Sequence, residues 1–186
     1  FKGTGIHVGN DGYLEFAEGT ETVIENGTTA SNSAEGGIEI GDNTAIKVHN
    51  SAKLTIRDIA GTGIRLDKAN NELHLDHNSE LTIERCSDRG LFVDNDNRIF
   101  SYSGSKVTLS ENTAETTVDY GKKGGGAYFG EATGWNCESG VELIADGNYA
   151  EIDGGGIYFA PGFKYEGTGE PWFNYGGVTS LPDTMQ

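Results

Sequence analysis

The sequence contains little proline and little positive charge, and it has no long apolar run. Only 3 of the 186 residues are proline, and the 29 glycines follow no three-residue period, so a collagen-like structure is excluded. Lys and Arg number 13 against 29 Asp and Glu, which gives a net charge of -16 at pH 7. Such a surface repels phosphate backbones and anionic lipid, so we expect no nucleic-acid partner. Because no apolar run approaches the length of a membrane span, we also expect no direct membrane insertion.

Glycine, in contrast, is abundant and marks an internal repeat. In six places a glycine precedes a short stretch of alternating apolar residues, and the two most alike are GGGAYFG from Gly124 and GGGIYFA from Gly154. The first apolar residues of these stretches are 26 to 36 positions apart: Ile6, Ile38, Ile64, Leu91, Ala127 and Ile157. A repeat of this length is typical of solenoid proteins, in which each unit packs only on its neighbours.

Each repeat contains two further alternating stretches, separated by Gly, Asn, Asp and Ser. The second stretches are YLEF, AIKV, ELHL, RIFSY and GWNC, and the third are ETVIEN, KLTIRD, ELTIER, KVTLSEN and GVELIAD. Three such stretches per unit predict three short strands, and equivalent strands would stack about 4.8 Å apart around one core. We therefore predict an all-β fold, a right-handed parallel β-helix of about five to six coils of three short strands each. A two-sheet sandwich is the alternative fold.

The predicted coils occupy residues 1–160, and residues 161–186 are expected to form an irregular segment that packs on or caps the helix. The pattern at Phe1 begins in mid-repeat, so we expect the chain to be part of a larger protein. The glycine before each first strand is expected at a tight corner, where neighbouring backbones crowd and φ can be positive. The residue at the centre of each first strand is expected to point outward: His7, Glu39, Arg65, Phe92, Tyr128 and Tyr158.

Two repeats resemble a known family. The stretches LSENTAETTVDYGKKGGGAYF and LIADGNYAEIDGGGIYF are similar to the repeats of polymorphic outer-membrane proteins and related bacterial adhesins, which pair a GGA[ILV] motif with an F-x-x-N motif. Residues 125–127 match the first motif, and residues 109–112 match the second with Leu in place of Phe. Asn26 matches more loosely, whereas Asp58 and Cys86 stand near the asparagine position in coils two and three. The resemblance implies an extracellular segment on the bacterial cell surface, and it implies no particular ligand.

The outward aromatic residues of three successive coils form the candidate site. Phe92, Tyr128 and Tyr158 would create a platform, and aromatic faces stack on sugar rings. Three neighbouring carboxylates could hydrogen-bond sugar hydroxyls: Asp94, Asp96 and Glu131. The competing interpretation is that loops or the C-terminal segment cover the platform, because Trp172 and Phe173 themselves need cover.

The leading functional hypothesis is a non-catalytic binding or structural segment of a bacterial cell-surface adhesin, with a glycan or a host surface protein as its partner. The alternative is a polysaccharide lyase or glycoside hydrolase of the pectate-lyase-like β-helix type. Such enzymes align carboxylates on adjacent coils. Here the acidic stretches DNDNR (residues 94–98) and HLDHN (residues 74–78) follow different strands, and no two carboxylates are neighbours in the first outward column. We therefore predict no catalytic residue, no metal site and no cofactor.

Two other sets of residues are assigned structural roles. Thr55, Thr82 and Thr108 form an outward column that Val23 and Glu142 end, and β-propensity on an exposed strand explains it better than ice binding. The two cysteines, Cys86 and Cys137, lie in different columns about 10 Å apart along the axis. Because a disulfide needs Cα atoms within about 7 Å, we expect two free thiols.

Overall fold

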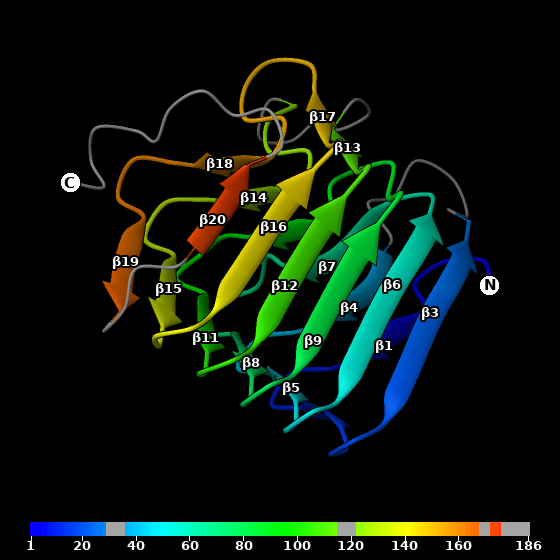
Figure 1. The fold of residues 1–186 in the computed structure, drawn as a ribbon. Helices are drawn as coiled ribbons and strands as arrows, with labels where there is room; N and C mark the ends of the chain where they lie inside the picture. Colours follow the sequence, from blue (N-terminus) through cyan, green and yellow to red (C-terminus); the bar gives the residue numbers. More distant parts are fainter. Residues whose placement is uncertain (29–35, 115–121, 168–171, 176–186) are drawn as a thin grey trace.

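The chain folds into three parallel sheets that surround one apolar core (Figure 1). The structure is a computed structural model that describes residues 1–28, 36–114, 122–167 and 172–175. The described residues contain strands and turns and no helix. Equivalent strands of successive coils pair in parallel, so the fold is the parallel β-helix that the repeats predicted.

Each of the three sheets has six strands. The first sheet contains β1 (Ile6–Val8), β4 (Gly36–Ile40), β7 (Thr62–Leu66), β10 (Leu91–Val93), β14 (Ala127–Phe129) and β18 (Ile157–Phe159). The second contains β2 (Tyr13–Phe16), β5 (Ala45–Val48), β8 (Glu72–Leu75), β11 (Arg98–Ser101), β15 (Gly134–Cys137) and β19 (Lys164–Gly167). The third contains β3 (Glu21–Gly27), β6 (Lys53–Ile59), β9 (Glu80–Glu84), β12 (Lys106–Ser110), β16 (Glu142–Asp146) and β20 (Trp172–Tyr175). Two short strands, β13 (Thr113–Ala114) and β17 (Tyr149–Ala150), pair outside these sheets.

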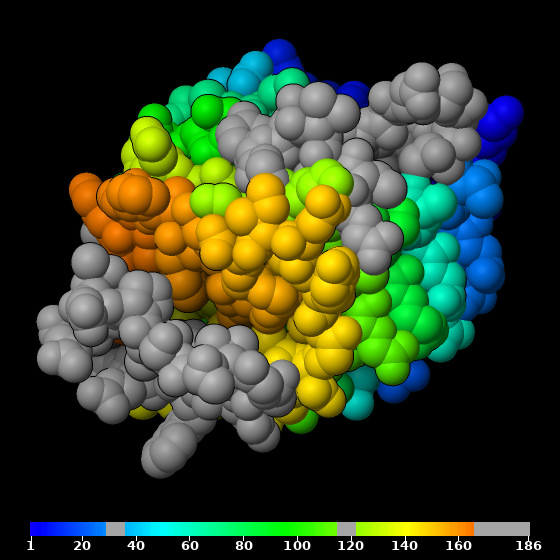
Figure 2. Space-filling view, turned by 90° about the horizontal axis from the view of Figure 1, so that it is seen from above, coloured from blue at the N-terminus to red at the C-terminus, as the bar shows by residue number. Residues whose placement is uncertain are grey.

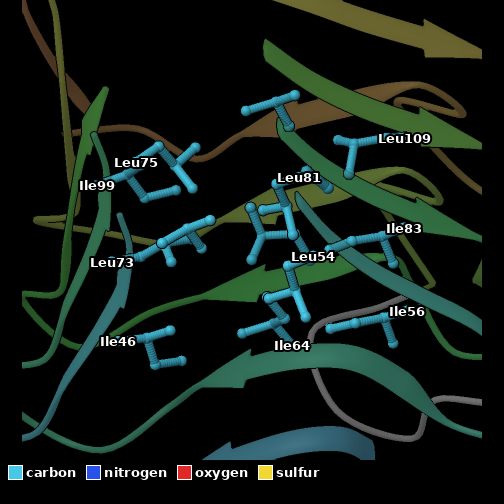
Figure 3. Packing of buried hydrophobic residues seen from close by; sticks show 14 of the residues in the cluster. Ile46, Leu54, Ile56, Ile64, Leu73, Leu75, Leu81, Ile83, Ile99 and Leu109 are labelled. Atoms are coloured by element: carbon cyan, nitrogen blue, oxygen red, sulfur yellow. The ribbon is translucent and has the colours of Figure 1, made fainter. Parts of the chain in front are cut away.

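The register of the first sheet confirms the predicted faces. Ile38 pairs with Ile64, and Ile64 with Leu91, so the inward residues stack on one another. Side chains from the three sheets meet in the interior (Figure 3), and their relative exposures are close to zero. A continuous stack of this kind removes apolar surface from water on every coil, which makes it the main favourable contribution to folding.

The third sheet differs from the prediction in coil five. The sequence placed Val141 opposite Val107, but Leu143 occupies that position, so the strand is two residues later than expected. The threonine column therefore runs from Thr55 through Thr82 to Thr108 and ends at Ile144, not at Glu142. Val141 is buried at the corner before the strand, and its apolar side chain made the alternation seem to begin early.

The C-terminal boundary also differs from the prediction. Strand β19 pairs with β15, and β20 pairs with β16, so strands continue past residue 160, where an irregular segment was expected to begin. The expected segment's other parts, residues 168–171 and 176–186, lie outside the described residues. Strand β20, which contains Trp172 and Phe173, belongs to the third sheet, whereas the aromatic column that it was expected to cover is on the first.

The corner between the third and first sheets explains why the sequence motif pairs glycine with asparagine. The buried side chain of Asn112 accepts a hydrogen bond from the Cys86 N–H (3.0 Å) and donates one to the Ile83 carbonyl (2.9 Å). A Cβ at Gly90 would lie 2.8 Å from the Asn112 Nδ2 atom and 2.7 Å from the Gly126 carbonyl oxygen. The predicted crowding is thus confirmed. Positive φ, however, belongs to the first glycine of the triplet, as at Gly124 (φ 67°).

Alternating charges line the outer face of the third sheet. One column contains, in the order of the coils, Glu21, Lys53, Glu80, Lys106 and Glu142. Lys53 lies 3.1 Å from Glu80, and Lys106 lies 3.3 Å from Glu142. Since opposite charges face each other only in this register, the column favours the observed alignment of the coils.

Both cysteines are free thiols, as predicted, and the structure places both in buried positions. Cys137 is an inward residue of β15 and pairs in register with Ser101 of the preceding coil. Cys86 lies in the turn after β9, where its N–H bonds to Asn112. Burial raises the pKa of each thiol to about 12.

Candidate functional site

The predicted aromatic column is present on the first sheet and forms a stack of rings. Phe92 pairs in register with Tyr128, and Tyr128 with Tyr158. The ring centroids of Phe92 and Tyr128 are 5.2 Å apart with planes 14° from parallel, and those of Tyr128 and Tyr158 are 5.4 Å apart at 17°. We call these three residues the aromatic ladder.

The aromatic ladder is not the open platform that the sequence predicted. Phe92 is only 1% exposed and Tyr128 7% exposed. Moreover, the rings stack face to face. One face of Phe92 and of Tyr158 and both faces of Tyr128 pack against a neighbouring ring, so a sugar cannot stack on those faces. The expectation of a glycan-binding surface at these residues is therefore wrong. The alternation correctly showed that the side chains leave the interior, but it said nothing about what packs against them outside.

Cationic side chains contact the aromatic ladder. The guanidinium carbon of Arg89 is 5.3 Å from the ring centroids of both Phe92 and Tyr128, and Arg65 is 5.1 Å from that of Phe92. Arg89 is itself buried beside Asp88, with 3.6 Å between their charged atoms, and its Nε donates to the Lys123 carbonyl. These cation–π contacts make the ladder a structural element of the corner.

At the end of the ladder, Lys123 contacts the half-buried Tyr158. Its Nζ lies 4.5 Å from the ring centroid and donates a hydrogen bond to the Tyr158 hydroxyl at 3.2 Å. This hydrogen bond, with a smaller effect from Asp153, raises the pKa of Lys123. Lys123 and Asp153 also form an isolated parallel bridge between neighbouring coils. In the view of Figure 2 the gold segment lies against yellow-green segments of the chain.

The three carboxylates proposed to assist the platform lie on the turns after the first sheet. Asp94 is buried, and its Oδ1 lies so close to Gly130 that a Cβ there would be 1.8 Å away. Asp96 and Glu131 are exposed, each in the turn of its own coil. With one carboxylate buried and the ladder rings closed, these residues do not form a common ligand-binding surface.

One pair of carboxylates does occupy equivalent positions on adjacent coils. Asp67 directly follows Leu66, and Asp94 follows Val93, which pairs with Leu66. The pair lies just beyond the outward column of the first sheet, in which no two carboxylates are neighbours. However, Arg65 Nε binds Asp67 Oδ2 at 2.8 Å, and both aspartates are largely buried. The pair is therefore closed within the structure and presents no open acid and base.

A different set of rings lies on the outer face of the second sheet, and the sequence analysis missed it. Phe100 of β11 pairs in register with His74 of β8, and their rings stack with centroids 4.7 Å apart and planes 11° from parallel. Tyr102, two residues after Phe100, lies 6.5 Å from His74 at 15° and 5.7 Å from His77. The detectable signal was the alternation in RIFSY, whose second and third outward positions, Phe100 and Tyr102, are aromatic. We call Phe100 and Tyr102 the ring ledge.

Charged groups surround the ring ledge. His74 Nε2 lies 2.8 Å from Glu72 Oε2, and the exposed Asn136 of β15 pairs in register with Phe100. Further along the same face, in coil two, His49 lies between two carboxylates, with Nε2 2.9 Å from Glu15 Oε1 of coil one and Nδ1 3.4 Å from Asp76 Oδ2 of coil three. The face is thus a mixture of half-buried rings and carboxylates, which suits polar ligands that also carry an apolar side.

The described part of the chain contains neither a metal-binding cluster nor a membrane-spanning helix. In residues 1–28, 36–114, 122–167 and 172–175, no group of three or more His, Cys, Asp or Glu side chains is arranged to hold a metal ion. The same residues include no helix of the length and hydropathy needed to cross a membrane.

Comparison with known proteins returned no match. No protein-family model, curated protein or solved structure matches the chain. The assignment of a function therefore depends on the site geometry and the sequence motifs.

Proposed function

We propose that the chain is a non-catalytic, glycan-binding segment of a bacterial cell-surface adhesin, located outside the cell. The observation that carries this proposal is the corner in which glycine and asparagine meet. The repeats that this chain resembles pair a GGA[ILV] motif with an F-x-x-N motif. Here glycine and asparagine lie close together, since a Cβ at Gly126 would lie 2.9 Å from Nδ2 of Asn148. The motif resemblance thus has a physical basis in coil stacking.

The electrostatics are compatible with an extracellular binding role. The net charge is -16, and most basic side chains of the described residues are already paired, as in the contacts of Arg57 with Glu25 (2.6 Å) and Arg85 with Asp58 (2.7 Å). An acidic surface of this kind disfavours anionic partners and leaves neutral glycans, amino sugars and basic protein surfaces as candidates.

The test measures binding and turnover on the same material. The purified chain is applied to a glycan array with and without Ca²⁺, and it is also incubated with polygalacturonate while unsaturated product is followed. We expect binding to one or more glycans, no dependence on Ca²⁺ and no product. Formation of unsaturated product would instead support the alternative, a pectate-lyase-like enzyme, and binding to no glycan would contradict the proposal.

A further inference from the structure

We propose that the free edge of β3 is a docking site for an extended segment of another protein, which adds a parallel strand and carries basic side chains at alternate positions. The site is a backbone edge at the N-terminal end of the solenoid. The proposal is therefore independent of glycan binding.

Strand β3 is the last strand of the third sheet and pairs on one side only, with β6 (Figure 1). The Thr20 carbonyl accepts the Lys53 N–H, and backbone groups alternate between the two sides of a parallel strand. The N–H and C=O groups of Glu21, Val23 and Glu25 therefore face away from β6. Within the described ranges, no backbone hydrogen bond reaches these groups. An edge of this kind is a template for pairing with another chain.

Residues 1–3 define the direction of the added strand. The Gly27 carbonyl accepts the Ala60 N–H from coil two, so the groups of Thr28 face the free side. There Thr28 donates to the Phe1 carbonyl at 3.0 Å and accepts the Gly3 N–H at 2.8 Å, which makes a parallel bridge. Parallel pairing beyond β3 is thus already present directly after the free stretch, and a strand in the same direction would extend it.

The outward side chains of β3 define the charge of the partner. In the charge column Lys53 lies between Glu21 and Glu80, so acid and base alternate from coil to coil. On the free side Glu21 is exposed, the Glu25 side chain is 41% exposed, and Val23 between them is 52% exposed. Residues 1–28 also contain five acidic residues and one lysine. Basic residues opposite the two glutamates would continue the alternation.

The interior of the end coil favours apolar residues at the other positions of the added strand. Ile6, Val8 and Leu14 are only partly buried, whereas their partners in coil two are 0–1% exposed: Ile38, Ile40 and Ile46. Inward apolar side chains from an added strand would remove more of this surface from water. The expected partner thus alternates basic or β-branched residues outward with apolar residues inward.

The chain itself supplies the probe peptides. KLTIRD, residues 53–58, pairs in parallel with β3 within the fold, with Lys53 opposite Glu21 and Arg57 opposite Glu25. As a free peptide it has the basic outward and apolar inward residues that the second edge requires. ELTIER, residues 80–85, has the same inward Leu and Ile but two outward glutamates. LKITDR has the composition of KLTIRD with the basic residues moved to inward positions.

The test titrates the intact chain with each peptide and follows backbone amide shifts by NMR. Glu21→Lys/Glu25→Lys reverses the charge of the edge, and Glu142→Lys/Asp146→Lys, which makes the same change in the same two columns at coil five, is the matched control. Val23→Pro removes an N–H from the free side while leaving the charge and the pairing with β6. Thermal melting of each variant checks the fold.

We expect KLTIRD to bind about tenfold more tightly than ELTIER or LKITDR and to shift amides of β3. Glu21→Lys/Glu25→Lys should prefer ELTIER, Val23→Pro should lose binding, and Glu142→Lys/Asp146→Lys should bind as the parent does. Equal binding of KLTIRD and LKITDR would reduce the effect to general charge attraction and overturn the proposal. So would undiminished binding to a folded Val23→Pro variant, or no binding of KLTIRD to the parent.

Discussion

Individual residues at the corner between the third and first sheets connect neighbouring coils through their side chains. Asn112 is fully buried and contacts backbone groups of the preceding coil, while its own N–H donates to the Asn148 side chain of the next coil at 2.9 Å. Asn148 in turn donates to the Leu109 carbonyl at 2.7 Å. The asparagines thus satisfy backbone groups that the turn removes from the regular sheet ladders, which is why a buried polar residue is tolerated here.

Replacing Asn112 should therefore destabilise the fold. Asn112→Ala leaves the Cys86 N–H and the Ile83 carbonyl buried without this partner, and we expect a loss of roughly 2–4 kcal/mol in the free energy of unfolding. Urea unfolding measures the effect. Ser110→Ala, at a half-exposed position of β12, is the control and should change stability little. Equal midpoints for the two variants would contradict the structural role of Asn112.

The buried thiols predict a second residue-level effect, on stability at high pH. Unfolded thiols lose their protons near the ordinary cysteine pKa of 9.0, whereas Cys86 and Cys137 have a pKa of about 12 in the folded chain. Between these values the folded state binds more protons, so the free energy of unfolding should fall as the pH rises. A Cys86→Ala/Cys137→Ala variant should show a shallower fall in urea titrations across this range. Parallel curves for parent and variant would contradict the burial of the thiols.

At the scale of the strands, the charge column on the third sheet favours the observed alignment of the coils. Lys53 stands between Glu21 and Glu80, and Lys106 between Glu80 and Glu142. A shift of one residue in any strand would move these side chains to the interior, so charge and apolar alternation favour the same register. The pairs are half-exposed, and each contributes modestly.

Reversing one charge should expose this contribution. Lys53→Glu would place three carboxylates in a row, and we expect a loss of about 1 kcal/mol that becomes smaller as NaCl concentration rises. Lys53→Gln separates lost attraction from added repulsion, and its effect should be smaller. Thermal melting at low and high salt provides the measurement. A Lys53→Glu loss that does not respond to salt would show that packing, not charge, is responsible.

Most strands were predictable because apolar and polar residues alternate clearly along them. The predictions that failed, for the third strand of coil five and for the exposure of the aromatic ladder, failed for physical reasons. All six inward anchors of the first sheet stack as the sequence indicated, from Ile6 to Ile157. In coil five, however, Val141 and Leu143 are both buried, and the alternation cannot tell a corner residue from the first strand residue. The closure of the aromatic ladder depends partly on Arg89, a turn residue with φ of 81°, and two-residue periodicity carries no information about where such a side chain points.

At the scale of the whole molecule, the single core makes the coils interdependent. Ile64 is fully buried in coil three (Figure 3). It pairs in register with Ile38 of the preceding coil and Leu91 of the following one. Coils of this kind cannot bury their apolar side chains alone, so an error in the middle of the stack affects both neighbours.

Ile64→Asp tests this interdependence. An uncompensated carboxylate in the core should cost on the order of 4–5 kcal/mol or more and should remove the single cooperative melt seen by circular dichroism. Thr82→Asp, at a half-exposed outward position of β9, is the matched control and should melt close to the parent. If Ile64→Asp also melts within a few degrees of the parent, the inward assignment of the first sheet is incorrect.

The parallel pairing of successive coils has a mechanical consequence. The backbone hydrogen bonds between coils run along the solenoid axis, so tension applied along that axis acts directly on them and loads the coils in series. The chain should then yield one coil at a time. The register between Ile38 and Ile64 assigns 26 residues to one coil, which corresponds to about 90 Å of extended chain in place of a rise of about 4.8 Å. In the proposed role as a cell-surface adhesin, such a segment would lengthen in steps under tension and so limit the force that reaches a bound ligand.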